Sequence, residues 1–167
     1  MTSSESIGAR QGPTPTRGAD EERQLAGFYV GAGLYGIEIM RIKEVIQAAP
    51  HPIRPVPLAP AIVEGVIQLR GVVIPVVDLR RRFGTGVDEA VVRLNKLIIV
   101  SVSGRIAGLK VDRVIGELRV PQRAVRPAPS MLRPTGAAAA TQDMFHGVCR
   151  VGDEMVFLLN LEALLSV

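Results

Sequence analysis

Few side chains in this sequence have the types and the spacing that catalysis requires. His51 lies in the proline-rich stretch PHPIRPVP, and His146 lies far from it in the strand-like run FHGVCRV. The sequence contains no GxSxG, HExxH or Walker pattern and no paired cysteines, so no activated nucleophile or metal site is indicated. Cys149, the single cysteine, falls on an apolar run and is expected to be a buried spectator. We therefore predict a protein without enzymatic activity, metal or cofactor.

Residues 31–36, GAGLYG, satisfy the GxGxxG pattern of dinucleotide-binding proteins. That pattern binds a pyrophosphate only when it opens a helix and an acidic residue follows about 20 positions later. Here the residues from Tyr35 to Ile39 alternate as a strand would, and no carboxylate lies near Val56. The stretch therefore predicts a glycine-rich hairpin turn.

Arg70 and Glu44 are the charged residues most suggestive of a binding site. Arg70 stands alone between Leu69 and Gly71 in an apolar run, where a charge needs a partner if it is buried. One interpretation is a structural ion pair with Glu44 that joins neighbouring strands and contributes little if it is exposed. The other is a recognition site, in which the planar arginine fork and the nearby carboxylate orient a partner helix. Both interpretations can hold.

Composition limits the class of protein. The chain has 167 residues, 47% of them hydrophobic, which suffices for one domain, or for two small closely packed halves, with a real core. No apolar stretch approaches the ~18 residues of a membrane helix, and the N-terminus lacks the apolar core of a signal peptide. We expect a cytoplasmic protein with no direct membrane insertion.

The net charge of +4 permits two kinds of partner. Positive charge is concentrated between Arg41 and Arg82, which suits an acidic protein surface at least as well as phosphate. Aromatic residues make up only 4% of the chain and tryptophan is absent, so base-stacking platforms are scarce. A protein partner, and no nucleic acid, is the favoured prediction. A basic β-barrel that binds single-stranded nucleic acid is the alternative.

Short β-branched runs recur from Leu25 onward at intervals of about 8–12 residues and predict an all-β barrel or sandwich. The runs are LAGFYV, LYGIEI, KEVIQ, GVIQL, GVVIPVVDL, KLIIVSV, RIAGLKV, RVIGEL, FHGVCRV and EMVFLLNL. Residues 1–23, rich in Ser, Thr, Pro, Gly and charge, predict a disordered N-terminal tail. Two-residue hairpin turns are expected at residues 103–104 and 152–153.

Proline and helix-forming residues mark exceptions to this strand pattern. Pro75 is expected at a sheet edge or a bulge, because it cannot donate to the ladder. Helix is expected only as a turn at residues 59–63 and as one turn in LEALL near the C-terminus. The run from Arg80 to Arg82 indicates a solvated strand end, with partner contact as a second interpretation. Residues 121–143, with several prolines and an AAAA run, predict a long excursion.

The two halves of the chain resemble each other. Residues 36–39, GIEI, match residues 108–111, GLKV, and residues 65–79 match residues 147–161 at a constant offset of 82. We infer two related β units, about 25–83 and 96–165; chance similarity between two strand-rich halves is the alternative.

The charges of the first half do not recur in the second. When the two halves are aligned, Arg70 corresponds to Gly152 and Glu44 corresponds to Gly116. The arginines at 80–82 correspond to residues 162–164, EAL. A scaffold that folds without these charges in one half does not require them in the other, so they are candidates for function. Asp78 lies opposite Asn160, which predicts a turn or cap role for its oxygen.

The motifs as a set resemble the CheW family of bacterial chemotaxis coupling proteins. They are LYGIEIMRIKEVI, PVPLAPAIVEGVIQLRGVVIPVVDLRRRFG, GRIAGLKVDRVIGE, VRPAP and GDEMVFLLNLEALL, in that order, and they cover about residues 25–165. The resemblance implies two intertwined five-stranded SH3-like β-barrels within one domain at 24–165, with strand exchange between the barrels and a hydrophobic groove separating them.

The resemblance also implies a function. Members of this family are non-enzymatic adaptors that link the cytoplasmic hairpin tip of a chemoreceptor to the regulatory domain of a histidine kinase. We accordingly expect a monomer that joins a larger array and associates with membrane-bound receptors only through its partners.

Site residues follow from the resemblance by matching position. The positions tied to receptor or kinase coupling are Glu44, Gly65, Arg70, Lys96, Gly108 and Gly147. Arg126 and Met131 fall in a kinase-contacting loop. Lys96 stands where the family more usually has an apolar residue, and Met131 replaces an aromatic one.

Overall fold

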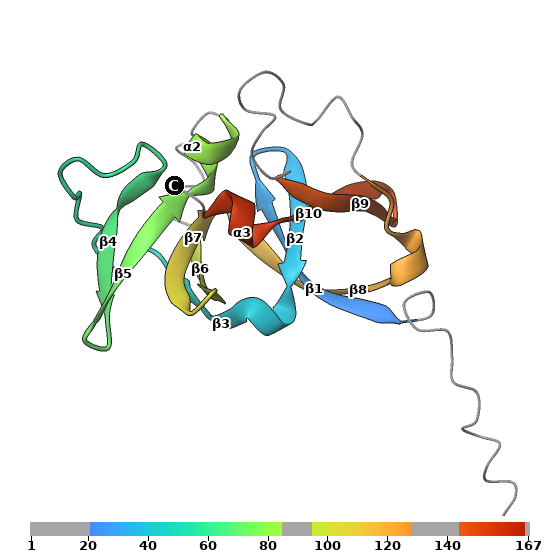
Figure 1. Cartoon of the computed structure of the whole chain (residues 1–167), viewed down its shortest axis with the longest axis horizontal. Helices are drawn as coiled ribbons and strands as arrows, with labels where there is room; N and C mark the ends of the chain where they lie inside the picture. The colour runs from blue at the N-terminus through green and yellow to red at the C-terminus, as the bar shows by residue number, and fades with distance from the viewer. Residues whose placement is uncertain (1–20, 85–94, 128–143, 166–167) are drawn as a thin grey trace, which may run out of the picture.

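The computed structural model describes residues 21–84, 95–127 and 144–165. These residues form ten strands, two short α-helices and two 3-10 turns (Figure 1). The elements in chain order are β1 (Glu22–Val30), β2 (Gly33–Glu38), η1 (Ile39–Arg41), β3 (Ile42–Gln47), β4 (Val63–Leu69), β5 (Val72–Asp78), α2 (Leu79–Phe83), β6 (Lys96–Val102), β7 (Arg105–Val111), β8 (Arg113–Pro121), η3 (Gln122–Ala124), β9 (Phe145–Val151), β10 (Glu154–Leu159) and α3 (Leu161–Leu164).

The strands form two five-stranded sheets, which lie side by side in Figure 1. Sheet A has the order β8-β1-β2-β10-β9, and sheet B has the order β3-β6-β7-β5-β4. Each sheet contains one parallel pair, β2 with β10 in sheet A and β5 with β7 in sheet B. Each sheet therefore takes two strands from one half of the chain and three from the other. The predicted fold class, all-β with two intertwined five-stranded units and short helices, is confirmed.

The two sheets share the same pairing register. In the parallel pair of sheet A, Leu158 lies opposite Gly36; in sheet B, Val76 lies opposite Gly108. Each residue of β4 and β5 thus corresponds to the residue 82 positions later in β9 and β10, and each residue of β1 and β2 corresponds to the residue 72 positions later in β6 and β7. The internal repeat inferred from the sequence is a repeat of the fold.

Within the described residues, the buried apolar side chains form three clusters rather than one. One outer cluster, around Leu25 and Val156, is built from residues of sheet A. The equivalent outer cluster, around Leu97 and Ile74, is built from residues of sheet B. The central cluster contains residues of both sheets, including Phe28, and packs them against each other. Strands β1 and β6 are apolar on both faces because one face meets an outer cluster and the other meets the central one. Each large apolar side chain buried there contributes about 1.5–3 kcal/mol.

The predicted hairpin turns are confirmed. Ser103 and Gly104 both have left-handed φ values, 52° and 77°, in the two-residue turn between β6 and β7. Gly152, with φ 63°, begins the two-residue turn between β9 and β10. The GxGxxG stretch forms a third such turn, since Val30 pairs with Gly33 across it.

Pro75 lies neither on an edge strand nor at a bulge. Strand β5 is interior, and the register shift of the β4–β5 hairpin falls between Val63 and Gly65. Val66, opposite Pro75, uses both its N–H and its C=O to bond Arg54, at 2.9 Å each. The missing N–H of Pro75 therefore costs no bond between β4 and β5, and the parallel pairing of β5 with β7 begins one residue later, at Val76.

The prediction of a strand end at Arg80 to Arg82 is wrong, because these residues form α2. Asp78 caps this helix, with its carboxylate accepting a hydrogen bond from the Arg80 N–H at 3.0 Å, and Gly84 ends it with φ 73°. Asn160 caps α3 in the same way, accepting from the Ala163 N–H at 3.2 Å. The cap role predicted for Asp78 and the helical turn predicted in LEALL are both confirmed.

Other boundaries differ from the predictions or fall outside the described residues. The segment at 59–63 contains hydrogen-bonded turns rather than a helix, closed by bonds such as that from the Val63 N–H to the Pro60 C=O at 2.9 Å. Glu22 already pairs with Pro121 in β1, although the predicted tail extends to residue 23. Residues 1–20 of that tail and 128–143 of the predicted excursion lie outside the described residues. In the described part of the chain, no helix is long and apolar enough to span a membrane.

Candidate partner-binding site

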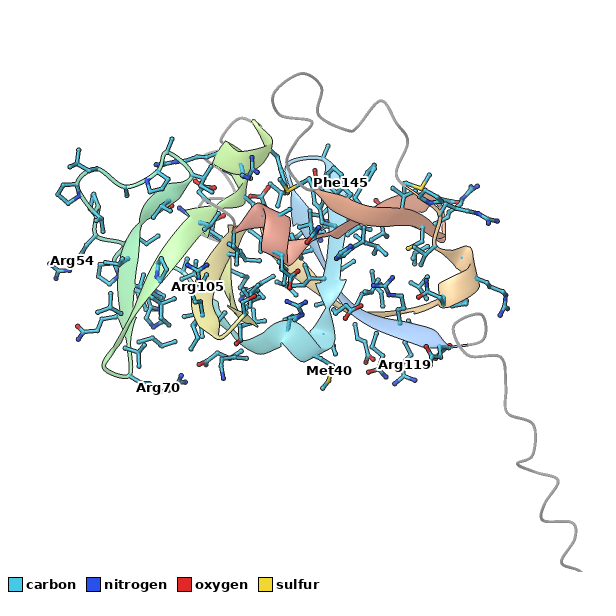
Figure 2. The ribbon with its side chains drawn as sticks, viewed as in Figure 1. Met40, Arg54, Arg70, Arg105, Arg119 and Phe145 are labelled. Atoms are coloured by element: carbon cyan, nitrogen blue, oxygen red, sulfur yellow. The ribbon has the colours of Figure 1, made fainter. Side chains whose placement is uncertain are left out.

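Arg70 lies at the tip of the β4–β5 hairpin rather than inside a strand (Figure 2). With φ 52°, it is the first residue of a two-residue turn, and Gly71, with φ 81°, is the second. The side chain of Arg70 is 69% exposed. The cost of burying a charge in an apolar run therefore does not arise at this position.

Arg70 and Glu44 form a two-point ion pair. Two guanidinium nitrogens of Arg70 donate to the two carboxylate oxygens of Glu44, one of them over 3.0 Å. Glu44 lies on β3, and Arg70 follows β4; these are the two edge strands of sheet B, so the pair joins opposite edges of one curled sheet. The hydrogen bond from Arg70 holds the pKa of the Glu44 carboxyl below its usual range. The local ion pair is thus present, and both side chains stay accessible to a partner.

Two of the predicted site glycines have a packing role. A Cβ on Gly65 would lie 2.2 Å from the carbonyl oxygen of Arg54, and a Cβ on Gly147 would lie 2.6 Å from that of Arg126. Val66, the residue after Gly65, forms a backbone bridge with Arg54, and Val148, the residue after Gly147, forms one with Arg126. Glycine at these positions lets a loop pack directly against the edge strand, which explains why both halves carry it.

The remaining predicted residues do not join the Arg70 site. Gly108 lies inside β7, where an added Cβ would meet Ile99 Cδ1 at 3.4 Å. Lys96 begins β6, opposite Gln47. Arg126 lies beside β9 in sheet A, and Met131 lies outside the described residues. The structure brings together Glu44 and Arg70, and separately Gly147 and Arg126.

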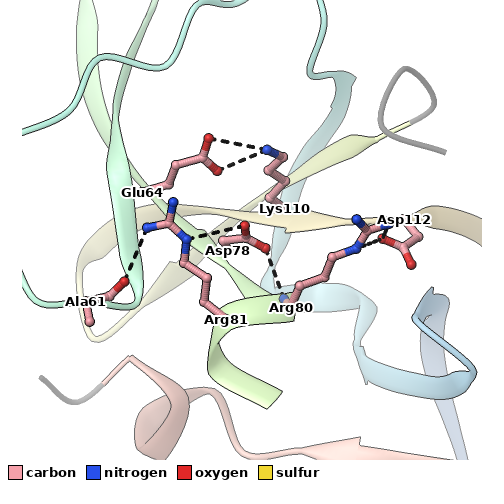
Figure 3. A network of polar contacts seen from close by, with 7 residues as sticks. All are labelled: Ala61, Glu64, Asp78, Arg80, Arg81, Lys110 and Asp112. Atoms are coloured by element: carbon pink, nitrogen blue, oxygen red, sulfur yellow. Dashed lines mark hydrogen bonds and ion pairs between the residues drawn. The ribbon is translucent and has the colours of Figure 1, made fainter. Parts of the chain in front are cut away.

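Sequence reasoning missed a buried ion pair between Arg80 and Asp112 (Figure 3). Arg80 is 5% exposed and Asp112 is 9% exposed, and the Arg80 Nε donates to Asp112 Oδ1 at 2.6 Å. Asp112 Oδ2 accepts a second bond, 2.7 Å long, from the N–H of Gly31 in the β1–β2 turn. The pair therefore ties helix α2 to a turn of sheet A. An acidic residue directly after the buried run GLKV was the available signal.

Internal pairing accounts for much of the positive charge between Arg41 and Arg82. Arg41 donates to Glu162 at 2.8 Å. In Figure 3, Arg81 donates to the Ala61 carbonyl at 3.3 Å, and its Nε lies 3.7 Å from Asp78 Oδ2. With Arg70 and Arg80 also paired, four of the seven cations in this region have a carboxylate partner. The charge pattern does not favour nucleic-acid binding.

The chemistry-bearing residues of the sequence are dispersed. Cys149 is 2% exposed in the outer cluster of sheet A, as predicted, and burial raises the pKa of its thiol. His51 follows β3 of sheet B, whereas His146 lies on β9 of sheet A. Within the described ranges, no group of three or more His, Cys, Asp and Glu residues could hold a metal ion.

The fold and this surface define a duplicated β scaffold with an exposed charged hairpin. Comparison with known proteins gives the family: the CheW-like domain matches residues 24–167, so the chain belongs to the CheW-like family. The chemotaxis protein CheW of Treponema pallidum is 34% identical over 152 residues, which cover 88% of this chain and 84% of that protein. Protein FrzA of Myxococcus xanthus is 32% identical over 150 residues, covering 89% of this chain and 88% of FrzA.

A solved structure supports the same assignment. The scaffolding protein TtCheW from Thermoanaerobacter tengcongensis superposes with a TM-score of 0.74 at 30% sequence identity, covering 88% of this chain and 94% of that one. The fold expected from the sequence resemblance and the family of the chain therefore agree.

Proposed function

We propose that this chain is a non-enzymatic adaptor that couples the cytoplasmic hairpin tip of a chemoreceptor to the regulatory domain of a histidine kinase. The adaptor role in chemotaxis is that of the CheW-like family to which the chain belongs. The particular partners, the monomeric state and the association with receptor arrays in the cytoplasm are parts of the proposal. Single contacts in such an assembly can be weak, because multivalent binding supplies the remaining affinity.

The observation that carries the proposal is the placement of the Arg70–Glu44 pair. The repeat of the fold puts Gly152 at the position of Arg70, with nearly the same φ, 63° against 52°. It also puts Gly116 at the position of Glu44, since both follow the register shift of their edge strand. The scaffold therefore folds at both positions without a charge. The N–H donors of Arg70 that Glu44 does not use lie on an exposed hairpin and suit recognition of a carboxylate or a carbonyl on a partner.

The other coupling residues support this surface indirectly. Gly65 and Gly147 hold the loops beside the edge strands, whereas a Cβ at Gly108 would make only an ordinary contact with Ile99. Substitution of Gly65 or Gly147 would alter partner binding by moving the scaffold. Lys96, Arg126 and Met131 are proposed as contacts on the strength of their positions in the family pattern alone.

The experiment compares Arg70→Gly with Arg70→Glu in binding to the kinase regulatory domain and to a receptor tip hairpin. Arg70→Gly copies the residue of the other repeat, so we expect an unchanged or higher melting temperature together with weaker binding. A loss of about tenfold would correspond to one exposed charge-assisted contact, and Arg70→Glu should lose more. Arg119→Glu, an exposed arginine on β8, is the matched control and should bind normally.

Two results would count against the proposal. Failure of the unmodified chain to bind both the kinase domain and the receptor hairpin would exclude the coupling function. A large drop in melting temperature for Arg70→Gly would instead assign the ion pair a structural role.

A further inference from the structure

A groove of about 300 Å³ opens beside sheet B, between strands β5 and β7 and helix α3. Its floor and walls include Val63, Pro75, Ala107 and Leu165. Arg105, labelled in Figure 2, and Glu162 line the groove with opposite charges. The volume lies at the small end of the range for ligand pockets, about 300–1,000 Å³, and suits a side chain rather than a cofactor.

The other repeat fills the equivalent space with aromatic rings. By the offsets of 72 and 82, Val63, Pro75, Ala107 and Leu165 correspond to Phe145, Phe157, Tyr35 and Phe83, respectively. The ring of Tyr35 lies 4.7 Å from Phe83, 6.0 Å from Phe157 and 6.4 Å from Phe145, centroid to centroid. Phe145 and Phe157 are 5.5 Å apart. All these separations are typical of packed aromatic pairs.

The same backbone therefore encloses a ring cluster in one repeat and an open groove in the other. The register of the strands around both spaces is identical, so the difference lies in the side chains. Four aromatic residues have been exchanged for Val, Pro, Ala and Leu, and the space that the rings occupy in sheet A is left accessible in sheet B. The backbone around the groove therefore has the arrangement that accommodates aromatic rings in the other repeat.

No aromatic side chain of the chain itself is available to fill the groove. The sequence contains four phenylalanines, two tyrosines and no tryptophan. Phe28, Tyr35, Phe83, Phe145 and Phe157 pack in the contacts around Tyr35, and Tyr29 bonds Glu154 and lies under Arg113. None of the six is among the exposed large hydrophobic side chains, so a second copy in this fold offers no ring either. The ring must come from a different protein.

The charges beside the groove indicate which charged group the ligand carries next to its aromatic ring. Glu162 is already paired with Arg41 at 2.8 Å. Arg105 is exposed, and among the described residues it forms no ion pair or side-chain hydrogen bond. A cation without a partner at the mouth of an apolar groove favours a ligand that carries a carboxylate next to its ring.

We propose that this groove docks a segment of a partner protein that inserts an aromatic side chain between Pro75 and Ala107 and places a neighbouring carboxylate on Arg105. The surface is separate from the Arg70–Glu44 pair, and its occupation does not depend on the coupling proposed above.

The probe is the blocked dipeptide N-acetyl-Asp-Phe-amide, titrated into the full-length ¹⁵N-labelled chain. We expect saturable shifts of amide signals at Ser103, Ile106 and Ala107, with a dissociation constant in the millimolar range. N-acetyl-Asp-Ala-amide, which lacks the ring, should produce no saturable shift at these residues. Absence of saturation with the Phe dipeptide, or equal shifts with both peptides, would overturn the proposal.

Variants test the two parts of the site separately. Pro75→Phe places a ring where sheet A has Phe157, and Pro75 is exposed, so the fold should tolerate it while binding is lost. Met155→Phe adds a ring at an exposed position of β10, away from the groove, and should bind normally. Arg105→Glu should weaken the Asp-Phe dipeptide about tenfold and leave N-acetyl-Phe-amide unaffected. Normal dipeptide binding by Pro75→Phe would contradict the proposal.

The oligomeric state of the chain tests whether the groove binds a different protein or a second copy of the same chain. We expect the unmodified chain to sediment as a monomer over a wide concentration range. If it instead self-associates and Pro75→Phe makes it monomeric, the groove belongs to an interface between two copies, and a different partner protein is excluded.

Discussion

The two sheets use one register for different purposes. Sheet A carries aromatic rings beside β2 and β10 and a Gly-Asp turn at the end of its β9–β10 hairpin. Sheet B carries an open groove and an Arg-Gly turn at the equivalent places. The positions whose rings sheet A commits to its own packing line an accessible groove in sheet B, and both hairpin turns are exposed, but only the turn of sheet B carries an arginine. Duplication of a stable scaffold thus leaves one copy free to acquire binding features.

The short helices show the same contrast in their ion pairs. Arg80 of α2 pairs with Asp112, which follows β7, and Glu162 at the equivalent position of α3 pairs with Arg41, which follows β2. The charges are reversed, and the environments differ. The Arg80 and Asp112 side chains are 6% and 12% exposed, whereas those of Arg41 and Glu162 are 36% and 39% exposed. Arg41 lies one residue beyond Met40, the equivalent of Asp112, so each repeat links its short helix to the segment after a paired strand, by a buried pair in one and a solvated pair in the other.

The largest effect is expected at the buried link. Asp112→Ala leaves the Arg80 guanidinium buried without its partner and removes the acceptor for the Gly31 N–H, so we expect a loss of about 3–5 kcal/mol in the free energy of unfolding. Urea unfolding followed by circular dichroism measures it. A loss below that of Glu162→Ala would show that burial does not distinguish the two links.

An intermediate effect is expected at the loop-packing glycines. Gly65→Ala and Gly147→Ala push a methyl group against a backbone carbonyl, which typically costs about 1–3 kcal/mol. Gly65 should be the more sensitive, because its Cβ would lie at 2.2 Å rather than 2.6 Å from that oxygen. Thermal unfolding of both variants tests this order. Gly108→Ala, with its nearest contact at 3.4 Å, is the control and should stay close to the unmodified chain.

The smallest effect is expected at the exposed link. The hydrogen bond from Arg41 lowers the pKa of Glu162. A carboxyl with a lowered folded-state pKa stabilises the fold above its unfolded pKa, and this contribution disappears as the pH falls through the folded pKa. Glu162→Gln should therefore cost about 0–1 kcal/mol at neutral pH, and nothing once the carboxyl is protonated. The free energy of unfolding of both proteins is measured as a function of pH. A difference between Glu162→Gln and the unmodified chain that grows toward acid pH would contradict this assignment.

Sequence reasoning succeeded where a pattern is local or repeated. Ten strand-like runs gave ten strands, and the match of Asp78 with Asn160 gave two helix caps, because alternation and capping depend on neighbours along the chain. It failed at Pro75, because edge and interior strands are distinguished only by which other strands pair with them. The Arg80–Asp112 pair was missed for a similar reason, since the two residues lie on different elements.

The open groove was within reach of the sequence but needed one further comparison. At the offset of 82 the two halves differ in charge, which singles out Arg70, and they also differ in side-chain size. Applied to size, it sets Val63, Pro75 and Leu165 against three phenylalanines. That these positions surround one space could be learned only from the fold, because they lie on β4, on β5 and directly after α3.

The sequence by itself determined the all-β class, the repeat, the hairpin turns and the family resemblance, since each depends on residue types at fixed separations along the chain. The tertiary structure decided which strands are interior, which arginine is buried and which repeat keeps its groove open. Those properties depend on contacts between residues far apart in sequence, and two equal patterns of strands can enclose different side chains. The placement of Arg70 combines both: the sequence marked it as a charge the scaffold does not need, and the fold put it at an exposed turn.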